Sequence, residues 1–440
     1  MDKRQRQDFE NPQLINSEEK AKKVAKVQQD VFSDDICFEI ISMLDDSWFI
    51  LNTCSLISKQ FFKVIKERSK LAIQFQKKFT EKRVKLFMKS QFMNSIVKVK
   101  FSSRLLQAIE TPKLISAMKQ LTSLNIYDNG IGDEEIKYIS EMKQLTSLNI
   151  GYNRVGDEGA KYLSEMKQLT SLNIGYNRVG IEGAKYLSEM EQLTSLNIGY
   201  SRIGIEGVKY ISEMKQLTSL NISKNEVSNE GAKYLSEMKQ LRLLNIYHNE
   251  IGDEGVKYLS EMKQLTSLHI GYNRIGLEGV KLISEMEQLT SLDISENEIS
   301  DEGAKYLSEM EQLTSLNIDY SRIGLEGVKY ISEMKQLTSL TIAYNRIGIK
   351  GAKLISEMKQ LRLLDISNNE ISDEGAKYLS EMKQLISLYI SEIGIGIKGV
   401  KYISEMKQLR LLDITRNRIG KEGAKLLSEM KQLTPLCLEL

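Results

Sequence analysis

Apolar positions recur along the chain with a period of 24 residues, without insertion or deletion, from Leu121 to Gln432. We number the positions of each 24-residue unit, here termed a coil, from 1 at Leu121, so that coil 1 is 121–144 and coil 13 is 409–432. Apolar side chains at positions 1, 4 and 6 point inward from a short strand, while positions 3, 5 and 7 face outward. The later apolar positions follow helical spacing. The pattern predicts an α/β solenoid with parallel strands on a concave face and short helices on a convex face.

Position 9 is Asn in most coils, and such a side chain can bond to the backbone of adjacent coils where the chain turns away from the strand. Ser201 and Ser321 replace it with a shorter hydrogen-bonding group, and Ile393 has none. We therefore expect a ladder of Asn side chains that is weakest near residues 391–399. Its members are Asn129, Asn153, Asn177, Asn225, Asn249, Asn273, Asn297, Asn345, Asn369 and Asn417.

Two further columns concern the helices. Position 12 is Gly or Ser, and Ser228, Ser300 and Ser372 are residue types that cap helix N-termini, so we expect them to cap here. Position 22 is Met in every coil, from Met142 to Met430. Because thioethers fill irregular gaps well, this column predicts core packing rather than a metal or redox site.

The segments before the repeats divide into three regions. Residues 1–30 are charged and predicted to be disordered, residues 31–66 have the pattern of a small all-α domain, and residues 67–95 predict a basic helical connector. Residues 96–120 resemble an atypical first repeat, so the predicted solenoid covers 96–440. The connector, with aromatic residues among its lysines, could alternatively be a patch for RNA or a membrane surface.

The repeats resemble leucine-rich repeats of the ribonuclease-inhibitor type and a 24-residue subclass that contains Gly-Ala. Residues 31–66 resemble an F-box. The matching positions of the F-box pattern are Asp34, Asp35, Ile36, Ile40, Ile41, Leu44, Leu56, Ile57, Ser58 and Lys59, whereas Phe32-Ser33 and Phe61 depart from it.

The resemblance implies the substrate receptor of an SCF-type cullin-RING ubiquitin ligase, in which the F-box binds a Skp-family adaptor and the repeats bind a folded target protein. Such a receptor has no catalytic residues, metal or cofactor of its own. The residues implied for adaptor binding are Phe32, Ile36, Ile40, Leu44, Leu56, Ile57 and Phe61. The alternative is a leucine-rich-repeat scaffold or GTPase regulator unrelated to ubiquitin transfer, which would stimulate a GTPase without an adaptor.

Six coils carry Tyr at position 8 followed by Arg at position 10. The other coils do not have this pair of residues, so the fold of a coil does not require Tyr and Arg there. Tyr and Arg are enriched at interface hot spots, so we expect a Tyr/Arg strip that binds a partner, its rings and guanidinium groups stacked on each other. The alternative is that each Tyr shields its own coil and each Arg is merely solvated. The strip comprises Tyr152, Arg154, Tyr176, Arg178, Tyr200, Arg202, Tyr272, Arg274, Tyr320, Arg322, Tyr344 and Arg346.

Charge and composition narrow the partner classes. The net charge is +2, and Glu at position 10 of four coils interrupts the strip, which suits a folded protein better than a nucleic acid. Leu243, Leu363 and Leu411, each preceded by Arg, are either further anchor points or neutral variants. The three cysteines do not have metal-ligand spacing, which predicts a reducing compartment, the cytoplasm or alternatively the nucleus. The sequence contains no long apolar run, which predicts that the protein has no membrane span.

Overall fold

The computed structural model describes residues 63–65, 70–75, 93–105, 115, 118–433 and 436–437. The predicted tail over residues 1–30 and nearly all of the F-box-like region 31–66 lie outside the described residues. All seven residues implied for adaptor binding lie outside them as well.

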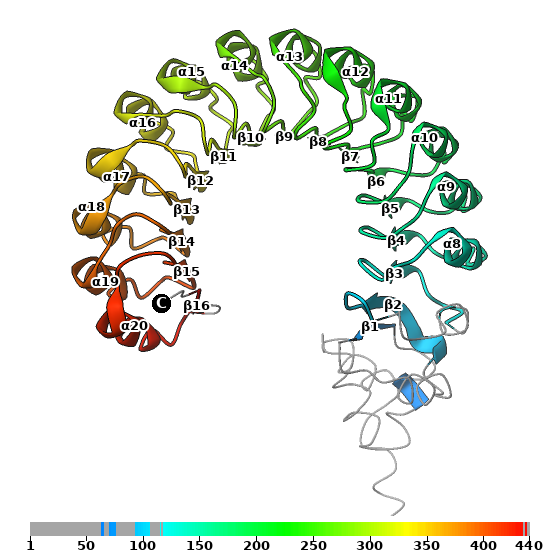
Figure 1. The fold of residues 1–440 in the computed structure, drawn as a ribbon, viewed down its shortest axis with the longest axis horizontal. Coiled ribbons are helices and arrows are strands. Elements are labelled where there is room, and N and C mark those ends of the chain that lie inside the picture. Colours follow the sequence, from blue (N-terminus) through cyan, green and yellow to red (C-terminus); the bar gives the residue numbers. More distant parts are fainter. Residues whose placement is uncertain are drawn as a thin grey trace, which may run out of the picture.

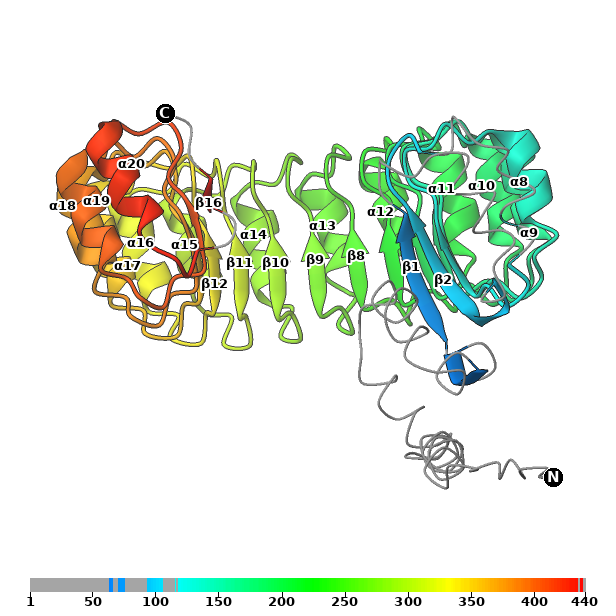
Figure 2. The same ribbon diagram turned by 90° about the horizontal axis from the view of Figure 1, so that it is seen from below.

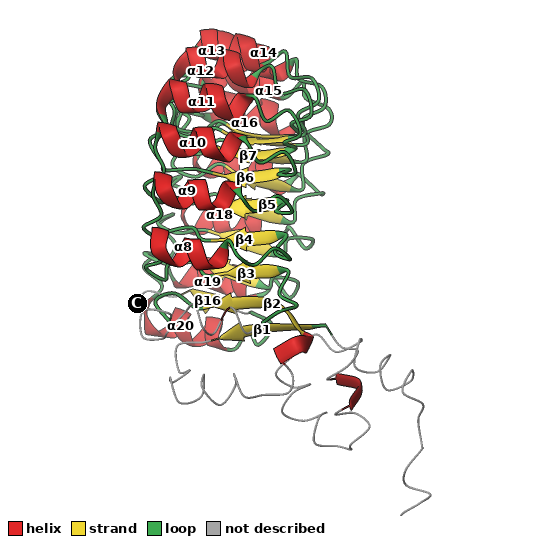
Figure 3. Ribbon diagram, turned by 90° about the vertical axis from the view of Figure 1, so that its right-hand side faces the viewer, coloured by secondary structure: helices red, strands yellow, loops and turns green. Residues whose placement is uncertain are grey.

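Sixteen strands of the described chain form one parallel sheet in which each strand neighbours the next in sequence. They line the inner face of a horseshoe, and the helices cover its outer face (Figure 1). Figure 2 shows the strands side by side along the inner face, and Figure 3 shows the helices and strands as two layers. The predicted α/β solenoid is therefore confirmed for the described residues.

The strands are β1 (Leu71–Phe75), β2 (Ile96–Phe101), β3 (Ser123–Asn125), β4 (Ser147–Asn149), β5 (Ser171–Asn173), β6 (Ser195–Asn197), β7 (Ser219–Asn221), β8 (Leu243–Asn245), β9 (Ser267–His269), β10 (Ser291–Asp293), β11 (Ser315–Asn317), β12 (Ser339–Thr341), β13 (Leu363–Asp365), β14 (Ser387–Tyr389), β15 (Leu411–Asp413) and β16 (Leu436–Cys437). The helices are the 3-10 turn η2 (Met93–Ser95) and α8 (Asp133–Ile139), α9 (Asp157–Ser164), α10 (Ile181–Ser188), α11 (Gly204–Ser212), α12 (Ser228–Leu235), α13 (Asp253–Leu259), α14 (Leu277–Ser284), α15 (Ser300–Leu307), α16 (Leu325–Ser332), α17 (Gly348–Ser356), α18 (Ser372–Leu379), α19 (Ile397–Ser404) and α20 (Gly420–Ser428).

The core follows the repeat positions. Because all coils have the same length, equivalent residues pair across the sheet, as Ser195 does with Ser219 and Leu196 with Leu220. Leu193, Leu196 and Ile198, at positions 1, 4 and 6, are at most 1% exposed. The methionine column is buried from Met142 to Met430, which confirms its assignment to the core.

The Asn ladder is present and joins each coil to the one before it. The Nδ2 group of Asn249 donates to the carbonyls of Ile222 and Ile246 and to the position-7 carbonyl of its own coil. Its Oδ1 accepts from the N–H groups of Asn225 and Val227. One buried amide therefore satisfies five backbone groups that the turn would otherwise leave open.

The exceptions to the ladder behave according to their chemistry. Ser201 Oγ is buried without a hydrogen-bond partner, whereas Ser321 Oγ donates to the carbonyl of Asp319 at 3.0 Å. Ile393 is 1% exposed, and its side chain has no polar atom to contribute. The following Asn417 accepts from three N–H groups of this coil, including that of Ile393. Ile393 thus makes no side-chain bond to the preceding coil, but neither do Ser201 and Ser321, so the predicted weakness is not confined to residues 391–399.

The residue at position 13 determines how the helix of the next coil begins. Asp157 Oδ1 accepts from Gly180 N at 2.7 Å and from Gly183 N at 2.9 Å, so it caps α10 from the neighbouring coil. Position 12 of the capped coil is then extended, with φ −99° at Gly180. The other residues that bond the position-12 N–H of the next coil are Asp133, Asn229, Asp253, Asp301 and Asp373.

Where position 13 is Ile or Leu, position 12 of the next coil adopts the left-handed conformation. The expected side-chain caps at Ser228, Ser300 and Ser372 are therefore wrong, since none of the three helices has a side-chain cap hydrogen bond. Ser228 N instead donates to Asn249 O at 2.9 Å. The residues with φ of 58–63° at this position are Gly204, Ser228, Ser300, Gly348, Ser372 and Gly420.

Replacing Asp157 by Ala should lower the free energy of unfolding by about 1 kcal/mol, since the first N–H groups of α10 lose their acceptor. Asp157→Asn should leave the free energy of unfolding nearly unchanged, because Asn229 caps α13 through its Oδ1 atom, which is equivalent to Asp157 Oδ1. Urea unfolding followed by far-UV circular dichroism measures both. Equal losses in the two variants would contradict the cross-coil cap.

The segment before the first repeat contains a strand that the sequence pattern did not predict. Leu71, Ile73 and Phe75 are buried while Ala72 and Gln74 are exposed, and the strand pairs in parallel with β2. The prediction of a helical connector is wrong for residues 71–75, because Leu71 and Phe75 fit a helical spacing but Ile73 between them gives a period of two.

The first coil therefore does not end the sheet. Phe75 stacks on Phe101 with ring centroids 4.8 Å apart, so β1 covers the hydrophobic end of the solenoid. In the predicted atypical repeat, the apolar residues Ile96, Val99 and Phe101 are buried, but the sheet begins at Leu71 rather than at Ile96. Of the remainder of the proposed connector, the structure describes only Lys70 and the 3-10 turn η2 (Met93–Ser95).

Candidate functional site

Position 8 lies directly after each strand, where the chain turns toward the helix. In all thirteen coils this residue is left-handed, with φ of 50–59°. Gly, Asn and Asp tolerate that conformation best, and a bulky aromatic residue there is an outlier. The turn is thus required by the scaffold, whereas a tyrosine in it is not.

The tyrosines of coils 2–4 form a continuous row. Tyr152 and Tyr176 have ring centroids 5.7 Å apart, and Tyr176 and Tyr200 stack at 3.9 Å with an interplanar angle of 15°. Tyr127, at position 7 of coil 1, extends the row with a centroid 5.9 Å from Tyr152. The rings remain accessible, since Tyr152 is 50% exposed.

The other predicted tyrosines form separate short groups. Tyr320 and Tyr344 stack at 4.0 Å, and Tyr272 stacks on His248 at 4.2 Å. The structure therefore divides the predicted strip of six tyrosines into one row of three, one pair and one single residue. Glu296 occupies position 8 between Tyr272 and Tyr320 and interrupts the row.

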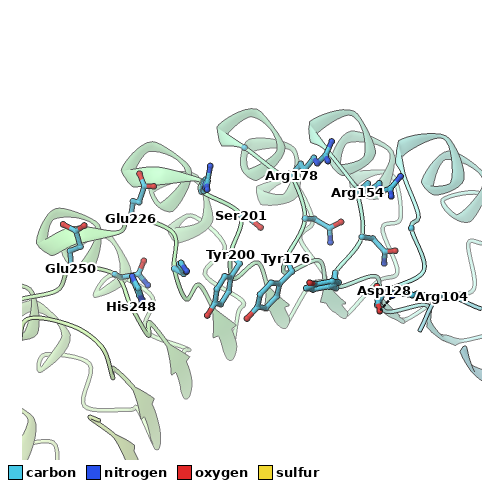
Figure 4. A pocket seen from close by; sticks show the side chains of 18 residues that line it. Arg104, Asp128, Arg154, Tyr176, Arg178, Tyr200, Ser201, Glu226, His248 and Glu250 are labelled. Atoms are coloured by element: carbon cyan, nitrogen blue, oxygen red, sulfur yellow. Dashed lines mark ion pairs between the residues drawn. The ribbon is translucent and has the colours of Figure 1, made fainter. Parts of the chain in front are cut away.

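The expected stacking of Tyr on Arg is not observed among the described residues, where the rings contact one another instead. The cation closest to the row is Lys224, whose Nζ lies 5.0 Å from the Tyr200 ring centroid. The side chains of Arg154 and Arg178 form a second row beside that of Tyr176 and Tyr200 (Figure 4). The two rows form the walls of a groove.

Salt bridges distinguish the arginines of this second row from two of the later ones, Arg274 and Arg322. Arg274 pairs with Glu250 at 3.1 Å, and Arg322 pairs with Glu298 at 3.2 Å, in each case with the Glu of the preceding coil. Within the part of the chain that the structure describes, the arginines of coils 2–4 have no acidic partner. These are Arg154, Arg178 and Arg202, all exposed.

The groove between the two rows extends from coil 1 to coil 6 and has a volume of 1190 Å³. Asp128, paired with Arg104 at 3.7 Å, lies at one end, and Glu226 and Glu250 line the other end. Unpaired positive charge is thus concentrated in the middle of the groove, since Asp128 and Glu250 at the two ends are each paired with an arginine.

Sequence reasoning missed several residues of the groove. Lys224 and His248 line it because they occupy position 8 of coils 5 and 6, and the repeat position was the signal that could have found them. Tyr127 and Tyr247 are at position 7, one residue earlier, yet their rings reach the rows of the adjacent coils. Their contribution depends on side-chain direction across coils, which the repeat alone does not give.

The pKa values of two of the stacked tyrosines, Tyr176 and Tyr320, are raised. Burial, followed by a hydrogen bond to Tyr200, raises the pKa of Tyr176 to about 12. Burial and a hydrogen bond to Tyr344 raise the pKa of Tyr320 to about 12. Burial and the nearby Lys224 lower the pKa of His248 below its usual value, so His248 is uncharged at pH 7. The row therefore offers hydroxyl donors without negative charge.

The inner surface becomes acidic toward the C-terminal coils. Asp293, Asp319, Asp365 and Asp413 lie at positions 5 or 7 of coils 8–13. Burial, and next the charge of Asp365, raise the pKa of Asp319 to about 7, and burial also raises the pKa of Asp365. The inner face of the C-terminal half thus carries a row of carboxyl groups that the N-terminal half does not have.

The other positions considered as binding or metal sites include Leu243 and the glycines of coil 12. Leu243 is 46% exposed and available for contact, but the guanidinium of the preceding Arg242 donates to the carbonyl of Gln264 at the end of the same coil. In coil 12, the N–H groups of Gly396 and Gly399 donate to Asp373, as in the other cross-coil caps. Among the described residues, no set of three or more His, Cys, Asp or Glu side chains is arranged to hold a metal.

No helix within the described ranges combines the length and the apolar composition needed to cross a bilayer.

Comparison with known families identifies the repeats. A model described as "Leucine-rich repeat region" matches residues 102–302, and a model described as "Leucine Rich repeat" matches residues 312–332, 359–380 and 407–428. Neither match includes residues 31–66, so these comparisons give no evidence for an F-box. The search of curated proteins found no significant match.

Solved structures of similar proteins share low identity with this chain. An internalin from Listeria monocytogenes is 20% identical, covers 90% of this chain and 94% of its own, and has a TM-score of 0.43. A leucine-rich-repeat protein from Leptospira interrogans is 19% identical over 86% of this chain and 98% of its own, with a TM-score of 0.45.

Proteins built from these repeats are typically non-catalytic. The matched models, the fixed period and the parallel inner sheet agree with one another. The chain is a leucine-rich-repeat protein.

Proposed function

We propose that this protein is a protein-binding scaffold and that its partner docks in the groove of coils 1–6. The observation that carries the proposal is the conformation of Tyr152, Tyr176 and Tyr200, with φ of 57–59°. A left-handed non-glycine residue costs about 1–2 kcal/mol. Asp128 and Asn368 fill the same position in other coils, so the fold does not need tyrosine there.

An exposed aromatic row that is kept in a strained conformation supports binding rather than folding. Inward-facing core residues already hold these coils together, since Leu172 and Ile174 are at most 1% exposed. The row is also flanked by unpaired arginines, and aromatic residues together with Arg are the types that contribute most at protein interfaces. A shielding role alone would not explain why the three rings contact one another across coils.

The test is a triple substitution of Tyr152, Tyr176 and Tyr200 by Asn, which suits the left-handed turn. Partner capture from cell lysate, quantified by mass spectrometry, should fall about tenfold or more while unfolding stability changes by about 1 kcal/mol or less. The matched control replaces the convex tyrosines Tyr162, Tyr186 and Tyr210 by Asn. Unchanged capture by the groove variant would contradict the proposal.

More specifically, we propose that the scaffold is the substrate receptor of an SCF-type cullin-RING ubiquitin ligase, acting in the cytoplasm or nucleus. The support is the F-box resemblance of residues 31–66, from which the residues proposed to contact a Skp-family adaptor follow. The solenoid would then hold the target, and ubiquitin transfer would occur on other subunits.

Calorimetry of the full chain with a Skp-family adaptor tests this more specific proposal. We expect submicromolar binding that is lost in the double variant Leu44→Asp, Ile57→Asp. The groove variant with three Asn residues is the control and should bind the adaptor normally. Absence of binding by folded wild-type protein would reject the ligase role and leave the scaffold role intact.

A further inference from the structure

We propose that coils 2–5 of the groove bind an extended acidic segment of the protein partner, an inference that rests on the protein-binding role proposed above. The segment lies across the coils. Its carboxylates face the arginine row, and its backbone and apolar atoms face the tyrosine row.

Charge is the first argument. Arg154, Arg178 and Arg202 are consecutive in space, exposed, and without an acidic partner among the described residues, and Lys224 of the next coil continues the positive charge. At the same repeat position Arg274 and Arg322 are neutralised by glutamates. Guanidinium groups bind carboxylates through charge-assisted hydrogen bonds, often in bidentate geometry. Only the N-terminal coils therefore offer an uncompensated row of such donors.

The length of this row fits a short peptide. Neighbouring coils are about 4.8 Å apart at the sheet, so coils 2–5 span about 14 Å, which an extended chain covers with roughly four to five residues. Beyond these coils the groove has no unpaired arginine, since Arg104 is paired with Asp128 at one end, and Glu226 and Glu250 line the other end. The acidic part of the segment is thus confined to the middle of the groove.

The tyrosine row favours a peptide over single-stranded nucleic acid. Tyr176 and Tyr200 cover each other's faces at 3.9 Å, and Lys224 lies over the Tyr200 ring. Nucleobases bind by stacking on open aromatic faces, and the faces that these two rings turn toward each other are already covered. Their edges and hydroxyl groups instead suit peptide carbonyls and carboxylates as hydrogen-bond acceptors.

The inner surface of the C-terminal coils is less suited to an acidic segment than the groove at coils 2–5. Coils 8–13 carry the buried or partly buried carboxyl groups of Asp293, Asp319, Asp365 and Asp413 on their inner surface, and among the described residues they have no comparable row of consecutive unpaired arginines. The partner is therefore expected to bind in one orientation, with its acidic segment on the N-terminal coils.

The experiment measures fluorescence anisotropy of a fluorescein-labelled oligoglutamate peptide titrated with the full-length protein. We expect saturable binding that weakens as salt is raised, and no binding of an oligoglutamine peptide of the same length. A labelled oligouridylate is the third probe. Tighter binding of oligouridylate than of oligoglutamate, or no saturable binding of oligoglutamate, would overturn the inference.

Two triple variants with the same change in net charge locate the site. Arg154→Gln, Arg178→Gln, Arg202→Gln should weaken oligoglutamate binding about tenfold or more. Arg274→Gln, Arg322→Gln, Arg346→Gln, at the same repeat position, should change it less than about twofold, because two of these arginines are already paired. Equal weakening by both variants would mean that general charge, and not the groove, binds the peptide.

The two proposals fail in different ways. If the groove variant with three Asn residues loses partner capture but oligoglutamate does not bind, the scaffold role stands and the acidic-segment inference is wrong. If partner capture is also unaffected by that variant, the groove itself is not the docking surface.

Discussion

Asn249→Ala should lower the free energy of unfolding by about 4 kcal/mol, the largest stability effect that we expect from one polar substitution in this protein. The Asn249 side chain is fully buried, and its five hydrogen bonds serve two N–H and three carbonyl groups of the turns. Alanine leaves all five without this partner, and a buried unsatisfied group costs about 1–3 kcal/mol. Urea unfolding followed by far-UV circular dichroism gives the magnitude.

Asn245→Ala is the matched control on the same coil. Asn245 accepts one local hydrogen bond, from Tyr247 N at 3.1 Å, and is half-buried, so its loss should be less than about 1 kcal/mol. Hydrogen-exchange mass spectrometry should show faster exchange in coils 5 and 6 for Asn249→Ala only. Similar stability losses in the two variants would show that burial of the amide is not what makes the ladder stabilising.

Leu244→Ala should lower the free energy of unfolding by about 3 kcal/mol, whereas Leu243→Ala, one residue earlier on β8, should change it by less than about 0.5 kcal/mol. Leu244 is 1% exposed and faces the core, while Leu243 is 46% exposed on the inner surface. The pair removes the same atoms from the two faces of one strand, so the difference between the variants measures burial alone. Chemical unfolding monitored by far-UV circular dichroism provides both values.

This second pair also addresses a question left open by the sequence, whether Leu243 contacts a partner or is a neutral variant. Leu243→Ala leaves the fold intact if it behaves as expected, so any loss of partner capture by that variant can be attributed to binding. A large stability loss in Leu243→Ala would instead indicate that the inner surface packs more tightly around β8 than its exposure implies.

The positive φ values connect the fold to the proposed binding role. Position 8 must be left-handed in every coil because the chain turns there from strand to helix. Residues that tolerate this conformation occupy it in coils 1 and 11, yet tyrosine occupies it in six coils. Strain that the scaffold does not require is common at functional positions, and this is the physical basis for placing the site at the groove.

The sequence by itself determined the solenoid, its core and its ladder. A fixed period of 24 residues forces equivalent residues into register, so Leu at positions 1 and 4, Ile at position 6 and Met at position 22 had to be buried together. The Asn at position 9 was predictable for the same reason, because each coil presents the same open backbone groups to the next.

Only the tertiary structure decided what depends on contacts between neighbouring coils. Whether position 12 is extended or left-handed follows from the residue at position 13 of the preceding coil, as Asp157 and Gly180 illustrate. Which arginines are neutralised depends on the Glu of the adjacent coil, and the tyrosines stack on each other because adjacent coils bring their rings within contact. A single repeat does not contain its neighbour's side chains, and it is those side chains that form the groove.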